Sequence, residues 1–130
     1  MTQKLFGDRR YASPMTWQPI FFARVGFWIA SGLVLFLSLM PSDQLPPIAL
    51  DVWDKAQHAV GFLVLGALGF WAYAAWHRRV LMGLLLFGAV IELLQSMTGW
   101  RHGDWLDWLA DSIGVMAAYV LFWLRSPGAK

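Results

Sequence analysis

Polar and ionisable side chains recur at intervals of three and four residues inside segments that are otherwise apolar. Residues at this spacing lie on one face of an α-helix, so each set predicts one polar helix face. Carboxylates and an imidazole that lie close together can share protons, bind a cation, or bind a ligand rich in amine or hydroxyl groups. The three sets are Asp54 with His58, Glu92 with Gln95, and Asp104 with Asp107 and Asp111.

Acid–base chemistry is one role open to these residues. Glu92 and Asp111 lie at a similar depth, on the order of 20 Å along their helices from the basic end, so they could divide the general acid and general base roles. His58 is an alternative base. In the competing interpretation a buried Asp–Arg or Glu–His pair only fixes the register of the helices. For the whole set we favour a functional role, because ionisable residues inside a membrane are costly and usually functional.

Positive partners for these acids are few, since only Lys55, Arg101 and a protonated His58 lie near them in the predicted arrangement. The remaining acids could bind a cationic or hydroxyl-rich ligand, while Arg101 suits phosphate. The predicted ligand-binding residues are Asp54, Lys55, His58, Glu92, Gln95, Arg101, Asp104, Asp107 and Asp111.

A metal site is a further alternative. Asp and His side chains supply oxygen and nitrogen donors of the kind that hold Mg, Mn or Zn, and the candidates are Asp54, His58, Asp104 and Asp107. Their spacing matches no established metal signature, so we predict no metal, and the sequence specifies no cofactor. The absence of Cys excludes disulfides and thiolate chemistry.

Four apolar segments must position these side chains. The chain has 130 residues, 58% of them hydrophobic, and nine Trp, which is too apolar for an ordinary soluble domain of this size. A hydrocarbon core of about 30 Å needs about 20 helical residues, and segments of this length cover residues 20–40, 56–76, 80–97 and 105–124. We therefore predict an all-α integral membrane bundle of four transmembrane helices. Residues 1–19 form an N-terminal lead, 20–124 the membrane domain and 125–130 a tail.

The charges sort to two sides of this bundle. Seven of the eight acids fall toward one side, whereas eight of the ten Lys and Arg fall toward the other. The positive-inside rule places both termini and the short connection at residues 77–79 in the cytoplasm, and the acids outside. The expected location is the inner (cytoplasmic) membrane. The basic residues of the inner side are Lys4, Arg9, Arg10, Arg24, Arg78, Arg79, Arg125 and Lys130.

The connections follow from turn-forming residues. Residues 41–53 contain three prolines and predict an irregular outer loop, with a helix restarting near Asp54. Gly99 and Gly103 predict a tight outer loop between the third and fourth segments. Trp residues near the segment ends, Trp100 and Trp108 among them, predict belts at the membrane interface. Gly26 and Ala30 have the small-x-x-x-small spacing of a helix dimer, but the oligomeric state stays open.

Three stretches together resemble the VanZ-like family of membrane proteins, over about residues 30–124. The first resembles the D-K-x-x-H-x-x-x-F signature, the second E-x-x-Q, and the third R-x-x-D-x-x-D-x-x-x-N-x-x-G. The chain departs from the third pattern in having Asp where many members have Asn, and Ala118 stands where a second Gly is common. The matching residues are Asp54, Lys55, His58, Phe62, Glu92, Gln95, Arg101, Asp104, Asp107, Asp111 and Gly114.

This resemblance implies a compact multi-helix membrane protein. The family takes its name from a protein associated with low-level resistance to the glycopeptide teicoplanin, and no accepted reaction accompanies the fold. Resistance by this particular chain would rest on fold-level analogy alone.

Three classes of function are compatible with these patterns. We favour an outward-facing polar pocket that binds a lipid-linked envelope precursor or a glycopeptide-type ligand. The alternative is a membrane-embedded hydrolase or transferase acting on a lipid-linked envelope substrate. Conduction is disfavoured, because no charged step follows Glu92 and Asp111 toward the cytoplasmic ends of these spans. Nucleic-acid binding is excluded, because the basic residues are few and lie near the membrane.

Overall fold

The structure is a computed structural model that describes the backbone of residues 17–41 and 51–125 and the side chains of residues 18–41 and 55–125. Four α-helices make up most of it: α1 (Trp17–Leu39), α2 (Asp51–Ala72), α3 (His77–Thr98) and α4 (Trp105–Arg125). A short 3₁₀ helix, η2 (Ala74–Trp76), joins α2 to α3. No strand occurs in the part of the chain that the structure describes, which confirms the all-α prediction.

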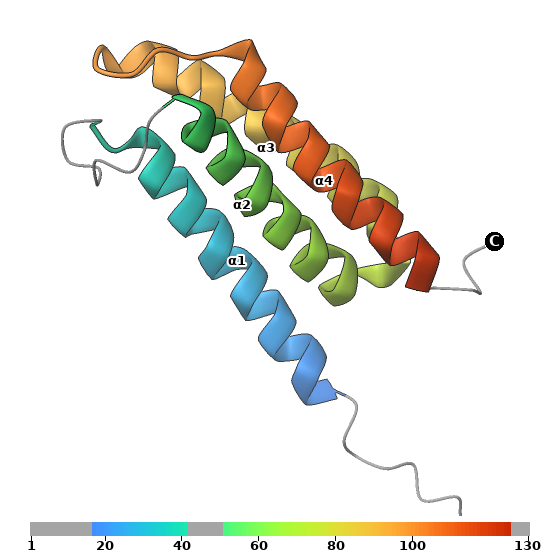
Figure 1. The fold of residues 1–130 in the computed structure, drawn as a ribbon. Coiled ribbons are helices and arrows are strands. Elements are labelled where there is room, and N and C mark those ends of the chain that lie inside the picture. Colours follow the sequence, from blue (N-terminus) through green and yellow to red (C-terminus); the bar gives the residue numbers. More distant parts are fainter. Residues whose placement is uncertain (1–16, 42–50, 126–130) are drawn as a thin grey trace, which may run out of the picture.

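The helices run antiparallel to their chain neighbours, with α2 at the centre (Figure 1). α2 packs most extensively against α4 and also contacts α1 and α3, whereas α1 and α4 do not pack against each other. The start of α1, the α2–α3 connection and the end of α4 lie at one end of the bundle. The end of α1 and the α3–α4 loop lie at the other, which we call the loop end.

Three stretches of helix are long and apolar enough to cross a membrane: Gln18–Leu39, Ala74–Thr98 and Trp105–Arg125. The remaining helix, α2, is more polar near its start, where Lys55, Gln57 and His58 lie. The outer faces of the bundle carry large apolar side chains, such as Phe22 on α1 and Leu86 on α3, which are about two-thirds exposed. Apolar outer faces suit contact with lipid, and the polar groups gather inside.

The connection between α2 and α3 differs from the prediction. We expected the second span to reach residue 76 and the connection to lie at residues 77–79, but α2 ends at Ala72 and His77 already begins α3. The chain leaves the helix at Tyr73 (φ −132°, ψ 44°), whose hydroxyl accepts a hydrogen bond from Trp28 Nε1 of α1 at 3.1 Å. Arg78 and Arg79 therefore lie exposed in the first turn of α3. The polar residues of this stretch did not mark the connection between the two helices.

At the loop end, the predicted tight loop is confirmed. α3 ends at Thr98, and Gly99 follows with φ +80°, a left-handed conformation that glycine adopts without strain. Gly103 lies against the backbone carbonyl of Glu92, so closely that a Cβ atom there would overlap it. α2 begins at Asp51, slightly before the expected restart near Asp54, and most of the expected proline loop, residues 42–50, lies outside the described residues.

Small residues let α2 and α4 approach each other closely. A Cβ atom added to Gly114 of α4 would overlap the backbone carbonyl of Ala59 on α2. One added to Gly66 of α2 would lie 2.6 Å from Ala118 Cβ. Beside this contact Leu65 and Val115 are fully buried. Small-residue contact of this kind is how helices pack where lipid surrounds them.

Replacing Gly114 by Ala should separate α2 from α4 and lower the free energy of unfolding by about 1–3 kcal/mol, the usual cost of overpacking. Gly32→Ala is the matched control, because nothing lies within 4 Å of a Cβ atom there, and should change it by less than about 0.5 kcal/mol. Both are measured by denaturation in detergent micelles. Equal effects of the two substitutions would contradict the close packing of α2 on α4.

Candidate functional site

Six ionisable side chains from three helices and one loop meet near the loop end of the bundle. α2 supplies two, α3 supplies one, and the start of α4 with the residue before it supplies three. We call this set the polar cluster. Its members are Lys55, His58, Glu92, Asp104, Asp107 and Asp111.

The upper layer of the cluster is an ion-paired group at the mouth. Lys55 Nζ lies 3.0 Å from Asp104 Oδ2 and 2.7 Å from Asp107 Oδ1. The Lys55 and Asp104 side chains are 39% and 37% exposed, whereas that of Asp107 is only 10% exposed. Lys55 therefore balances part of the negative charge of the upper layer, and both of its ion pairs are made there.

Asp104 also begins α4. Its Oδ1 accepts a hydrogen bond from the backbone N–H of Leu106 at 2.9 Å, which is the geometry of a helix N-cap. This hydrogen bond and the ammonium group of Lys55 hold the pKa of Asp104 below its usual range. The carboxylate therefore stays ionised through the neutral range.

The lower layer is more deeply buried. His58 Nδ1 lies 2.9 Å from Asp111 Oδ1, and these side chains are only 9% and 2% exposed. Glu92 approaches from α3, and its Oε2 accepts a hydrogen bond from the backbone N–H of Asp104 at 2.7 Å. Glu92 thus links α3 to the start of α4 and brings its other oxygen toward the lower layer.

Several buried oxygens of these helices have no hydrogen-bond partner among the described residues: Glu92 Oε1, Asp111 Oδ2 and Gln95 Oε1. Asp111 Oδ2 faces Gly88, one turn of α3 from Glu92, where an added Cβ atom would lie 2.9 Å away. Glycine at this position leaves room for the carboxylate between α3 and α4. A buried acceptor without a donor typically costs about 1–3 kcal/mol, more for a charged group, so the lower layer is an unsatisfied acid site.

Two residues of the predicted set contact the end of α1 instead. Gln95 Nε2 donates to the backbone carbonyl of Ser38 at 2.9 Å, and Arg101 Nε donates to that of Met40 at 3.2 Å. Trp100, which we placed in an interfacial belt, donates from Nε1 to the carbonyl of Leu39 at 3.1 Å. The last carbonyls of a helix lack partners within it, so these side chains tie α1 to the loop end. The side chain of Asp54 lies outside the described residues.

The metal candidates separate in the structure. Asp104 and Asp107 bind Lys55, whose ammonium group takes the place that a cation would occupy between them. His58, Glu92 and Asp111 instead each offer one ligand atom, all within 4.8 Å of one another. Of the expected metal candidates whose side chains the structure describes, His58 alone belongs to this second group, because the sequence does not show which acids a lysine neutralises.

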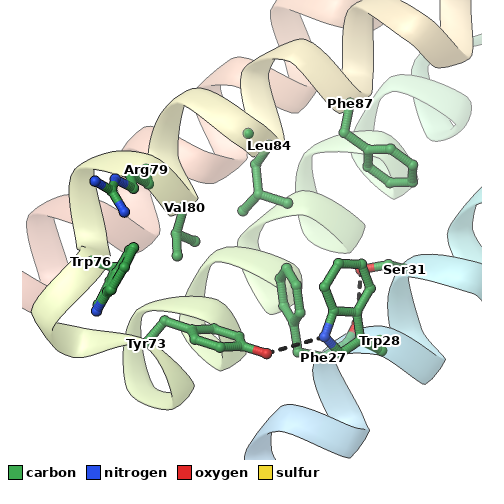
Figure 2. Close-up of a pocket in the computed structure, with 10 residues that line it drawn as sticks. Phe27, Trp28, Ser31, Tyr73, Trp76, Arg79, Val80, Leu84 and Phe87 are labelled. Atoms are coloured by element: carbon green, nitrogen blue, oxygen red, sulfur yellow. Dashed lines mark hydrogen bonds between the residues drawn. The ribbon is translucent and has the colours of Figure 1, made fainter.

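A groove of about 380 Å³ lies away from the loop end, between α1 and α3 (Figure 2). Its lining is mostly aromatic and aliphatic, and includes Phe27, Trp28, Tyr73 and Leu84. The Arg79 guanidinium lies 4.0 Å from the centre of the Trp76 ring at its edge. The sequence pattern gave Arg79 only a role in topology, and the neighbouring Trp76 was the one signal of this contact. No residue of the polar cluster lines the groove.

Comparison with known proteins assigns the chain to a family. A family model described as VanZ/LLP1 matches residues 11–126. The chain belongs to the VanZ/LLP1 family. This confirms the resemblance seen in the sequence, and the match spans all four helices and the whole polar cluster. No match was found among curated proteins or among solved structures.

Gln95→Leu in this VanZ/LLP1 protein should lower the free energy of unfolding by about 1–3 kcal/mol, because it leaves the buried Ser38 carbonyl without its donor. Ser96→Ala is the control, since the Ser96 hydroxyl is exposed and donates within its own helix, to Leu93. Detergent-based unfolding checks both. A stability unchanged by Gln95→Leu would argue against a structural tie and for a role in ligand contact.

Proposed function

We propose that this protein spans the membrane with four helices, has both termini on the cytoplasmic side, and binds a ligand in its polar cluster from the outer side. The ligand class is a lipid-linked envelope precursor or a glycopeptide-type molecule. The observation that carries the proposal is the pair of buried carboxylate oxygens, Glu92 Oε1 and Asp111 Oδ2, that have no donor among residues 18–41 and 55–125.

The charge balance of the cluster supports a ligand that brings donors or positive charge. Four carboxyl groups face one lysine and one histidine, and the lysine contacts only the upper pair. Water is scarce at this depth, so an oxygen left without a donor is costly. Amine and hydroxyl groups of a saccharide or peptide headgroup would supply those donors, while the exposed apolar faces of the helices suit its acyl chains.

The arrangement of charge supports the orientation. Arg79 and Arg125 belong to the end of the bundle where α3 begins and α4 ends, whereas the acids lie near the loop end. Bases mark the cytoplasmic side of membrane proteins. The loop end and the mouth of the cluster would then face outward, where envelope precursors and glycopeptides are met.

Single cysteines test the orientation cleanly, because the chain has none of its own. His102→Cys in the α3–α4 loop should react with a membrane-impermeant maleimide added to intact cells. Ala75→Cys in η2 should react only after the membrane is opened. Both side chains are exposed, so burial does not bias the comparison. The reverse labelling pattern would overturn the orientation.

Ligand binding is tested by native mass spectrometry of the purified protein titrated with two probes, a polyprenyl-linked saccharide phosphate and teicoplanin. Glu92→Gln and Asp111→Asn should each weaken binding of the accepted probe about tenfold, because a charged acceptor worth about 1.4 kcal/mol is lost. Arg125→Gln at the opposite end is the matched control. Binding of neither probe, or equal loss in the control, would exclude this ligand class.

A further inference from the structure

The lower layer of the cluster has the composition of a metal site. His58 of α2, Glu92 of α3 and Asp111 of α4 each place one ligand atom so that all three atoms lie within 4.8 Å of one another. Three atoms at the corners of a triangle with 4.8 Å sides lie about 2.8 Å from its centre. Metal bonds of about 2.0–2.2 Å to nitrogen and oxygen would need each atom to move by less than about 1 Å.

A second observation points to a missing positive group at the same place. Asp111 is 1% exposed, and its Oδ2 has no partner among the residues that the structure describes. This oxygen faces Gly88, on the side of α3 that also carries Glu92, whose Oε1 is likewise buried without a donor. Two carboxylates from different helices therefore each have a buried oxygen without a donor, close to the same imidazole.

None of the described Lys and Arg side chains forms a hydrogen bond or an ion pair with the lower layer. Lys55 pairs with Asp104 and Asp107 in the upper layer. Arg101 donates to the Met40 carbonyl, and Arg24 donates to the Ala72 carbonyl away from the loop end. Among the described residues, His58 in its protonated form is the one that brings positive charge to the lower layer, and a single such charge cannot balance both Glu92 and Asp111.

We propose that His58, Glu92 and Asp111 bind one divalent transition-metal cation of the Zn²⁺ or Mn²⁺ type. One imidazole nitrogen and two carboxylate oxygens suit these ions, whereas Mg²⁺ and Ca²⁺ prefer sites made of oxygen alone. Three protein ligands leave at least one coordination position open, as in catalytic zinc sites. Glycine at position 88 keeps the approach to Asp111 clear.

The cation also specifies what the proposed pocket would recognise. This step rests on the proposed function: a phosphate or hydroxyl oxygen of the headgroup would fill the open coordination position. Binding of the cation by the three side chains does not depend on that step. An acid-rich cluster would then accept a phosphate-bearing headgroup, which carboxylates alone would repel.

The test uses the full-length chain without a polyhistidine tag, purified in detergent, treated with EDTA and freed of chelator. Titration with ZnCl₂ and MnCl₂ in a calorimeter should show one cation per chain, and elemental analysis should give the same ratio after dialysis. Co²⁺ should give visible d–d absorption bands that report nitrogen and oxygen ligation. Bound cation should also raise the midpoint of thermal unfolding.

Asp111→Asn and Glu92→Gln should weaken binding of the cation at least about tenfold, whereas the control His102→Ala, which removes an exposed imidazole of the α3–α4 loop, should keep it. His58→Ala should also abolish the Co²⁺ bands. Thermal unfolding in EDTA shows that each variant folds, and a variant that does not fold is replaced by Asp111→Ser or Glu92→Ser. No stoichiometric cation, or equal loss in His102→Ala, would overturn the metal site.

The polyprenyl-linked probe separates the two proposals. Cation binding without any probe binding would leave the metal site standing and remove the proposed ligand. Probe binding that is equally tight in EDTA would keep the ligand and remove the cation from its recognition. Probe binding that needs Zn²⁺ or Mn²⁺ supports both.

Discussion

The close approach of α2 and α4 is the constraint on which the rest of the structure depends. Gly114 lies against the backbone carbonyl of Ala59, and no side chain larger than hydrogen fits between them. One helical turn from this contact, His58 meets Asp111 at 2.9 Å, and a further turn away Lys55 meets Asp107 at 2.7 Å. The short side chains of Asp107 and Asp111 reach their partners on α2 because the two helix backbones are so near.

Burial of charge shapes the cluster in two steps. The upper layer lies near the mouth, where Lys55 is partly exposed and can pair with two acids. In the lower layer the side chains of His58 and Asp111 are almost fully buried, and their contact leaves Asp111 Oδ2 without a donor among the described residues. An unpaired acid is tolerable in the first setting and expensive in the second. An Asp in the upper layer is therefore neutralised by Lys55, whereas Asp111, only one turn of α4 further along, keeps an oxygen without a donor among the described residues.

Sequence periodicity predicted much of this arrangement. The four helices, the α3–α4 loop and the two depths of acid follow from spacing and from the length of the apolar segments. Three features do not. The turn at Tyr73 depends on its contact with Trp28 of another helix. The contact of Gln95 with Ser38 depends on where α1 ends. The division of the acids between Lys55 and His58 depends on which helix faces meet.

Glu92 shows most clearly why the spacing of polar residues along a helix does not predict their contacts. Its spacing to Gln95 placed both side chains on one face, yet one of them contacts α1 and the other contacts the start of α4. Glu92 Oε2 accepts from the backbone of Asp104, and Asp104 in turn holds Lys55 and begins α4. The upper and lower layers are therefore joined through the backbone of a single residue. A change of charge at Glu92 would reach the mouth of the cluster through that residue, because the hydrogen bond to Asp104 holds the first turn of α4 in place.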